Sequence, residues 1–313
     1  MNKKIVSLRN QICQKENIKV LKIFDTNEHE LTKDVILGKW QNKKVVLRVG
    51  EHRLDNFFPQ GYLGKNFIIP EVYLINHQEN YEIEEYLPGK LFCNLLAKPK
   101  YNKLIINDQW LKRLIKAHWE FQKIVESKHL PIKYQKKDKI LKFYGYAKKS
   151  ISSTERIVVE KIINGKQYNF FWQKIYPCKW KYSHDNLLAM PKSKVGLIDL
   201  AGVGRRVWGY DLGWLFWPQW FNFSKSDYLK FKEHFEYLQK FFNLVYVHAP
   251  VKEKKQPKLF YQKCHLVLLE RIIGAMYDLN AKISHTRKVK SGQKSMMMKF
   301  LKGLLTLTLA KIN

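Results

Sequence analysis

The sequence has few acidic residues and very little arginine. It contains 57 Lys and Arg against 27 Asp and Glu, a formal net charge of +30 at pH 7, and only nine of the 57 are arginine. Nucleic-acid recognition favours arginine, because a guanidinium forms two parallel hydrogen bonds to a phosphate or a base. A charge carried almost wholly by lysine therefore argues against nucleic acid as the main partner. It would still attract a small anionic substrate.

Paired cysteines and long apolar runs are also lacking. The four cysteines form no C-x-x-C pair, which predicts reduced, mostly buried thiols rather than a disulfide framework or a metal site. No run of about 18 apolar residues is present, so no transmembrane helix is expected. Residues 1–17 lack the apolar core of a signal peptide. We therefore expect a cytoplasmic protein.

The composition is that of a folded chain. With 313 residues, 45% of them hydrophobic and 14% aromatic, it can bury the core of one large domain or two lobes. Alternating apolar residues around Gln41-Asn42-Lys43 predict a hairpin of two strands, 34–40 and 44–49. Further strands are expected at 18–24, 68–74 and 80–89, and helices at 3–16, 108–125, 150–168, 231–245 and 259–281.

A second predicted hairpin lies in the stretch from Lys181 to Trp217. Two strand-like runs, 186–190 and 194–199, flank a Pro-Lys-Ser turn. An antiparallel hairpin brings its outer ends together, so Asn186 and Asp199 should face one point. Two such oxygen ligands, with water and phosphate oxygens completing the shell, are how proteins hold Mg²⁺.

The motifs of this stretch resemble those of the aminoglycoside phosphotransferase and choline-kinase-like family. The matching segments are Asn186-Leu187-Leu188, Leu197-Ile198-Asp199-Leu200 and Tyr210-Asp211-Leu212. The resemblance implies an α+β, protein-kinase-like fold of two lobes. A small β-rich lobe would cover residues 1–87 and bind the nucleotide, and a larger, mainly helical lobe would cover residues 88–313.

The same resemblance implies roles for individual residues, with ATP and Mg²⁺ as cofactors. Asn186 and Asp199 would hold Mg²⁺, and Arg48 would contact the ATP phosphates. The segment Glu85, Tyr86 and Leu87 resembles the hinge that binds adenine through backbone groups. The resemblance also implies an acidic partner for Arg48 on a following helix. Glu51 and Asp55 are the nearby carboxylates, but Pro and Gly within residues 56–66 break any long helix there, so the partner stays open.

The catalytic loop departs from the family pattern and leaves two interpretations open. With the usual spacing, Lys181 stands five residues before Asn186, where the catalytic base is expected. With a shortened loop, His184 and Asp185 are the catalytic-loop residues and Asp185 is the base. Lysine cannot accept a hydroxyl proton near neutral pH unless its pKa falls strongly.

Two later segments each allow two interpretations. Residues 203–223 join Arg205 and Arg206 to a run of aromatic residues, which could bind sugar rings and phosphates or form the core face of a helix. Residues 282–311 combine lysines with Met and Leu and contain no acidic residue. That segment is either a basic helix lying on an anionic membrane, at the inner face, or a terminal helix docked on the lobe.

We therefore expect an ATP-dependent phosphotransferase acting on a hydroxyl of a small molecule, such as a sugar or a lipid-linked sugar. The first alternative is a catalytically impaired pseudokinase that binds a nucleotide or a partner. The second is a basic protein that binds membranes or nucleic acid.

Overall fold

The computed structural model describes most of the chain in two compact units. The first unit joins Met1–Leu95 with His184–Val203, and the second joins Leu96–Ser183 with Gly204–Asn313. The sequence predicted a single boundary, between residues 87 and 88, and that boundary stays a prediction. The described residues are 3–24, 33–50, 58, 60–92, 108–126, 137–166, 168, 175–179, 182, 186–200, 203–216, 225–281 and 291–312.

The first unit contains an antiparallel sheet of strand order β1-β2-β3-β7-β6. Its strands are β1 (Lys19–Phe24), β2 (Lys33–Trp40), β3 (Lys43–Gly50), β6 (Val72–Asn76) and β7 (Tyr81–Glu85). Gln41 and Asn42 turn the β2–β3 hairpin with φ angles of 46° and 65°. Positive φ at both positions is what a two-residue hairpin turn needs, and Asn tolerates it well. The predicted hairpin is confirmed.

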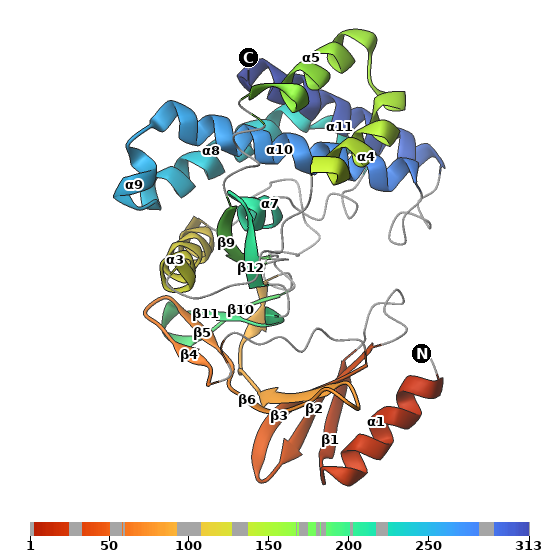
Figure 1. Ribbon diagram of the computed structural model, residues 1–313, viewed down its shortest axis with the longest axis vertical. Coiled ribbons are helices and arrows are strands. Elements are labelled where there is room, and N and C mark those ends of the chain that lie inside the picture. Colours follow the sequence, from red (N-terminus) through yellow and green to blue (C-terminus); the bar gives the residue numbers. More distant parts are fainter. Residues whose placement is uncertain are drawn as a thin grey trace. The chain divides into compact units, whose positions relative to one another are not determined.

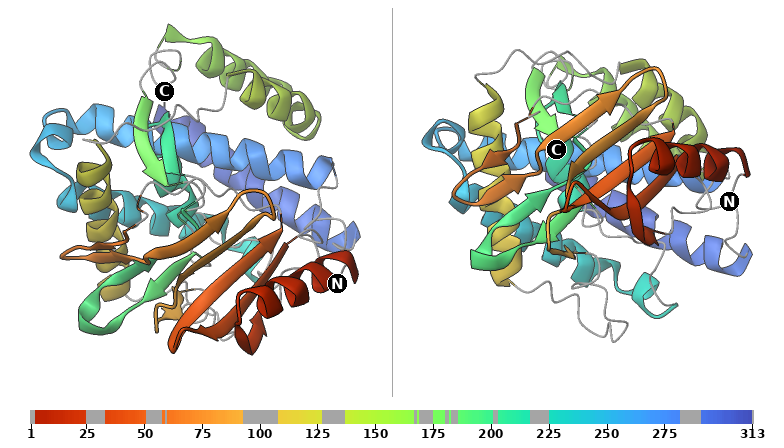
Figure 2. Two further views of the ribbon diagram at one scale, coloured as in Figure 1. Left: turned by 60° about the horizontal axis from the view of Figure 1, so that its bottom comes forward. Right: turned by 90° about the horizontal axis from the view of Figure 1, so that it is seen from below.

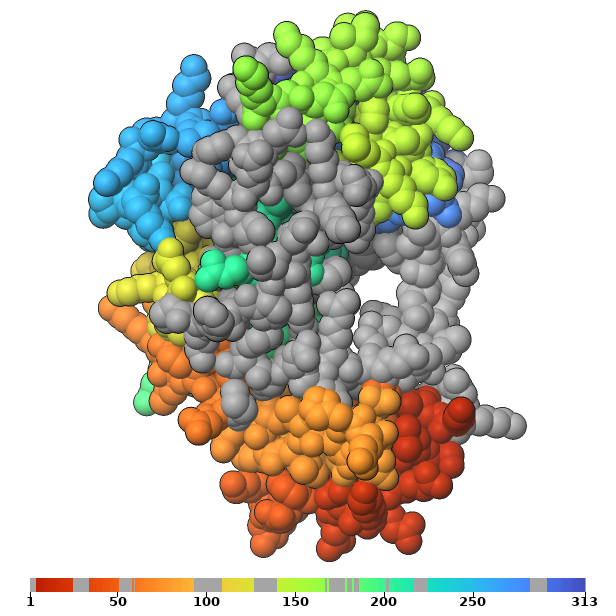
Figure 3. Space-filling model, in the orientation of Figure 1, coloured from red at the N-terminus to blue at the C-terminus, as the bar shows by residue number. Residues whose placement is uncertain are grey.

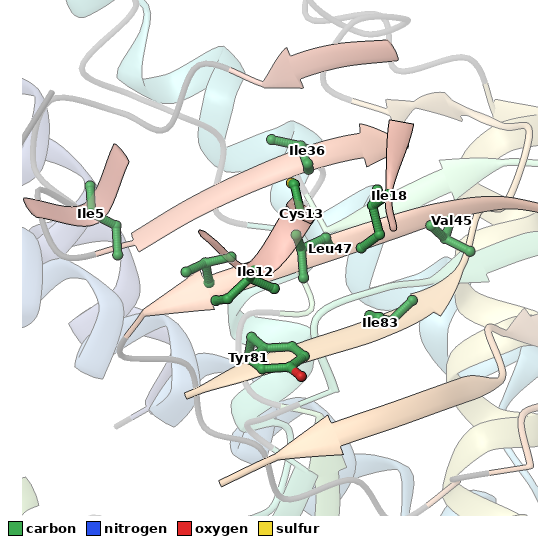
Figure 4. Packing of buried hydrophobic residues seen from close by; sticks show 10 residues of the cluster. Ile5, Ile12, Cys13, Ile18, Ile36, Val45, Leu47, Tyr81 and Ile83 are labelled. Atoms are coloured by element: carbon green, nitrogen blue, oxygen red, sulfur yellow. The ribbon is translucent and has the colours of Figure 1, made fainter. Parts of the chain in front are cut away.

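Helix α1 (Lys3–Lys15) covers one face of this sheet (Figures 1 and 2). The buried side chains alternate along β3, since Val45, Leu47 and Val49 have no exposed surface. They pack with Ile12 of α1 and with Tyr81 of β7 (Figure 4). Successive side chains of a strand point to opposite faces, so Val46 and Arg48 lie on the face away from α1.

A second sheet of the same unit has the strand order β4-β5-β11-β10-β8. Its strands are β4 (Tyr62–Leu63), β5 (Phe67–Ile69), β8 (Lys90–Leu91), β10 (Leu187–Ala189) and β11 (Val195–Leu197). Strands β10 and β11 form the second predicted hairpin, closed by the turn at Pro191–Ser193. β11 also pairs in parallel with β5, which ties the hairpin to the N-terminal residues.

The second unit is mainly helical. Its helices are α3 (Asp108–Glu126), α4 (Lys137–Ala147), α5 (Ser153–Asn164), α7 (Tyr210–Phe216), α8 (Phe231–His248), α9 (Val251–Lys254), α10 (Pro257–Asn280) and α11 (Ser291–Ile312). Strands β9 (Ile175–Lys179) and β12 (Val203–Val207) pair beside them (Figure 2). Helix α10 packs against α4, α8 and α11, while α4 and α5, yellow-green in Figure 3, form much of the visible surface of this unit. The α+β fold class predicted from the sequence is confirmed.

Helix α11 settles one of the open alternatives. Its apolar residues Met297, Phe300, Leu301 and Leu304 have no exposed surface, because the helix packs against α8 and α10. The terminal helix is therefore docked, and these side chains are not available for insertion into a bilayer.

Two expectations can be examined in the described part of the chain. None of its helices is long and apolar enough to cross a membrane. Cys13, Cys178 and Cys264 are buried, as predicted for most of the thiols; Cys93 lies outside the described residues.

The packing of α11 predicts the effect of one substitution. In Gly303→Ala, the new Cβ would lie 2.4 Å from Phe231 Cδ2 and 2.6 Å from Cγ, so the Phe231 ring or the helices α8 and α11 must shift. Overpacking of this kind costs about 1–3 kcal/mol of the free energy of unfolding, measured by urea denaturation. The control is Gly292→Ala on the same helix, where nothing lies within 4 Å of the new Cβ. Equal effects of the two substitutions would contradict the close contact.

Candidate nucleotide and metal site

The β10–β11 hairpin brings Asn186 and Asp199 together. The strands pair Leu187 with Leu197, and one step further out the Ile198 amide donates to the Asn186 carbonyl at 3.3 Å. The Asn186 side-chain amide Nδ2 lies 3.4 Å from Asp199 Oδ2. Asp199 has a φ of 55°, a left-handed conformation that few side chains other than Asn and Asp tolerate. The backbone thus holds this carboxylate in an unusual geometry beside the hairpin.

Arg48 lies among three carboxylates of the same unit. Its guanidinium binds Glu84 Oε1 through Nη2 at 2.8 Å and Nε at 2.9 Å, and Nε lies 3.3 Å from Glu82 Oε1. Burial by itself would lower the pKa of Arg48. The charges of Glu84, Asp199 and Glu82 outweigh this effect and raise the pKa above its ordinary value, so the guanidinium stays charged.

The cluster carries an excess of negative charge. Three carboxylates face one guanidinium, and burial, then the charge of Glu84, raise the pKa of Glu82 to about 7 against the opposing effect of Arg48. A divalent cation at Asp199 would offset this excess. Within the described residues no group of three His, Cys, Asp or Glu side chains is suited to a metal. Asn186 and Asp199 offer an amide oxygen and a carboxylate, a donor set of the kind that Mg²⁺ takes when phosphates and water supply the other ligands.

The sequence left the acidic partner of Arg48 open. Glu51 and Asp55, the nearby carboxylates of the segment after β3, lie outside the described residues. The structure provides Glu82 and Glu84 from β7, because β3 and β7 pair Arg48 with Glu82 and the period of two places Glu84 on the same face. The alternation of polar and apolar residues at 80–89 was the signal that could have identified them.

The hinge segment follows β7 directly. The backbone amides of Glu85 and Tyr86 donate to Glu71 and Lys44 at 2.8 and 3.3 Å, while that of Leu87 has no hydrogen-bond partner among the described residues. The Leu87 side chain is buried against Leu188 of β10. The predicted hinge is therefore anchored on both sides, and the Leu87 amide is left without a partner in the described part of the chain.

The predicted catalytic residues His184 and Asp185, and the competing Lys181, lie outside the described residues. Their roles stay predictions.

The structure does show the neighbouring motif residue Asp211, which is 1% exposed. It accepts a hydrogen bond from Gln122 Nε2 at 2.9 Å and lies 3.3 Å from His118 Nδ1. Asp211 thereby joins α7 to α3 inside the second unit.

Comparison with solved structures shows what this architecture resembles. An ADP-bound aminoglycoside phosphotransferase, APH(2'')-Ib, superposes with a TM-score of 0.57 at 14% identity, covering 96% of this chain and 98% of that one. The chain has the fold of the small-molecule phosphotransferases. Choline kinase LicA from Streptococcus pneumoniae gives a TM-score of 0.51 at 14% identity, covering 96% of this chain and 99% of that one. Macrolide 2'-phosphotransferase MphH from Brachybacterium faecium gives 0.56 at 9% identity, covering 92% and 96%.

These likenesses confirm, for the fold, the resemblance that the sequence motifs predicted. No protein family model and no curated protein sequence matches the chain. At such low identities the likeness establishes the fold, and an argument about activity must come from the residues of the site.

The raised pKa of Glu82 predicts how stability depends on pH. Folding raises this pKa from 4.5 to about 7, so the native protein binds a proton that the unfolded chain has lost between these values. The stabilisation is present at low pH and is lost as pH rises from about 4.5 to 7. Glu82→Gln should remove this loss and exceed the wild type in stability by about 1 kcal/mol or more at pH 8.

Urea unfolding with EDTA at pH 5 and pH 8 measures the difference in free energy of unfolding between Glu82→Gln and the wild type. The control is Glu126→Gln, which removes an exposed carboxylate of the second unit. The raised pKa is contradicted if the free energy of unfolding changes equally for Glu82→Gln and the wild type between the two pH values.

Proposed function

We propose that the protein is an ATP-dependent phosphotransferase that phosphorylates a hydroxyl group of a small molecule. The observation that carries the proposal is the cluster of Arg48, Glu82, Glu84 and Asp199 within one compact unit. Arg48, a cation suited to phosphates, lies within electrostatic range of Asp199, a carboxylate suited to a divalent metal. The ADP-bound phosphotransferase of the same fold supports the choice of a nucleotide as ligand.

The residues of the first unit would divide the work of binding. Asn186 and Asp199 would hold Mg²⁺, Arg48 would contact the phosphates, and the amide of Leu87 would donate to the adenine edge. Bound Mg²⁺ supplies neutralisation of the charge on the transferring phosphoryl group. Because Glu82 and Glu84 fix the guanidinium of Arg48, it would need little reorganisation when the nucleotide binds.

Asp185 would accept the proton of the acceptor hydroxyl, with His184 beside it in the catalytic loop. A sugar or a lipid-linked sugar is the acceptor class that we propose. Since Met297, Phe300, Leu301 and Leu304 of α11 are buried, contact of this helix with an anionic membrane would rely mainly on its exposed lysines.

A pseudokinase remains the second candidate, because Lys181 stands at the usual spacing of the base. In that case the first unit would bind the nucleotide without turnover.

Nucleotide binding is tested first by thermal unfolding with and without Mg-ATP. A ligand at 100 times its Kd adds about 2.7 kcal/mol, a rise of several degrees in Tm for a chain of this size. Asp199→Asn should abolish the rise, and it keeps a side chain that tolerates the left-handed backbone. Glu79→Gln, at an exposed carboxylate of the same unit, is the control and should keep the rise. No shift in the wild type at millimolar Mg-ATP would refute the nucleotide site.

Asp185→Asn then separates the enzyme from the pseudokinase. Losing a general base lowers turnover by about 10²–10⁴-fold, while the Tm shift with Mg-ATP should persist. ADP release measured over a panel of hydroxyl acceptors provides the rate. Unchanged turnover in the variant would exclude Asp185 as the base, and a wild type that binds Mg-ATP without turnover would favour the pseudokinase.

A further inference from the structure

The second unit contains a cavity that the proposed function does not use. It lies where α3, the turn between β12 and α7, and α9 meet, and its volume is about 280 Å³. Every residue that lines it belongs to the second unit. An apolar cavity of about 150 Å³ is enough to hold a molecule of benzene. This one therefore has room for a planar molecule of two fused rings.

Two tryptophans form much of the apolar wall of this cavity. Trp119 of α3 and Trp208, which is 3% exposed, line it together with Leu212 and Pro250. The Trp119 indole is held in place because its Nε1 donates to the Val245 carbonyl at 3.3 Å. Fixed aromatic walls with few polar groups suit a flat apolar ligand.

The lysines and glutamates of the cavity wall carry a balanced charge. They are Lys123, Lys252, Glu126 and Glu253. Lys252 Nζ lies 2.7 and 2.8 Å from the two carboxylate oxygens of Glu126 and so joins α9 to α3. Glu253 Oε2 lies 3.6 Å from Lys263 Nζ, and Lys123 is exposed to water. A ligand in the cavity therefore gains little from a charge of its own.

One polar side chain of the cavity has an unused hydrogen-bond acceptor. Gln122 of α3 donates from Nε2 to Asp211 Oδ2 at 2.9 Å, and this fixes the orientation of the carboxamide, since a carboxylate only accepts. Gln122 Oε1 accepts no hydrogen bond from any residue that the structure describes. A ligand in the cavity with a single N–H or O–H donor would complete the hydrogen bonding of Gln122.

We propose that this cavity is a binding site for a small, neutral, planar aromatic molecule with one hydrogen-bond donor. The volume, the two indole walls, the balanced charges and the unused acceptor of Gln122 together select this class. The cavity shares no residue with the candidate nucleotide site, which belongs to the first unit. The inference therefore does not rest on the proposed function.

The test is a calorimetric titration of the full chain with indole and with benzofuran. The two molecules share one frame, but benzofuran has a ring oxygen where indole has its N–H donor. We expect one indole to bind per chain with a Kd below about 1 mM. Benzofuran should bind about threefold to tenfold more weakly, the effect of one net hydrogen bond. Tryptamine and indole-3-acetate add a charge of either sign and should bind no more tightly than indole.

Gln122→Met tests the hydrogen bond to the ligand. Methionine is close to glutamine in length but has no carboxamide oxygen, so the variant should lose the preference for indole while binding benzofuran as the wild type does. An equal loss of affinity for both ligands would mean that Gln122 has only a structural role, and would contradict the proposal. The matched control is Gln239→Met, at a half-buried glutamine of α8 outside the cavity, which should keep the preference for indole.

Three further outcomes would overturn the inference. The first is a wild type that shows no saturable binding of indole, and the second is equal affinity for indole and benzofuran. The third is a charged analogue that binds about tenfold more tightly than indole, since the site would then select a charge. Retention of the preference for indole in Gln122→Met would also contradict the proposal, because the ligand would then lie elsewhere. The thermal shift with Mg-ATP tests the proposed function separately.

Discussion

The antiparallel pairing of β3 with β7 sets the geometry on which the candidate site depends. Its register places Arg48 opposite Glu82 while Leu47 and Val49 of the same strand stay in the core. A slip of one residue would turn Arg48 into the core and expose the apolar side chains. The hydrophobic packing under α1 therefore fixes the register, and the register fixes the ion cluster on the opposite face.

The ion pairs of Arg48 with Glu82 and Glu84 lie within one sheet. A protein-kinase-like site usually pairs its phosphate-binding cation with an acid on a separate helix, whose position can change. Here the two described carboxylates that contact Arg48, Glu82 and Glu84, come from the neighbouring strand, so contacts within the sheet orient the guanidinium. The arrangement has an electrostatic cost, because the carboxylates of Glu82 and Glu84 repel each other in a buried place. Burial, and then the charge of Glu84, raise the pKa of Glu82 accordingly.

The parts of the fold that local patterns determine could be predicted from the sequence. The alternation of apolar residues and the turn residues predicted both hairpins. Because the outer ends of an antiparallel hairpin meet, Asn186 was expected beside Asp199. The partners of Arg48 were not identified from the sequence, because they are not its neighbours along the chain. Glu82 and Glu84 reach Arg48 across a strand pair. The sequence could not decide whether α11 lies on a membrane or docks on the lobe, since lysines beside Met and Leu fit both arrangements. Only the contacts with α8 and α10 distinguish the two. The roles of Asp185 and His184 stay predictions.

The parallel pairing of β5 with β11 has a consequence for how the chain is assembled. It joins Phe67 to Val195, partners roughly 130 residues apart, and contacts of such long sequence separation form slowly and late. During synthesis, β5 lacks its parallel partner until β11 has emerged, so this side of the sheet stays unpaired in the meantime. By then α3, α4 and α5 of the second unit have already been made. The first unit thus begins before the second and is completed at Val203, between the two segments of the second, so the synthesis of the two is interleaved rather than sequential.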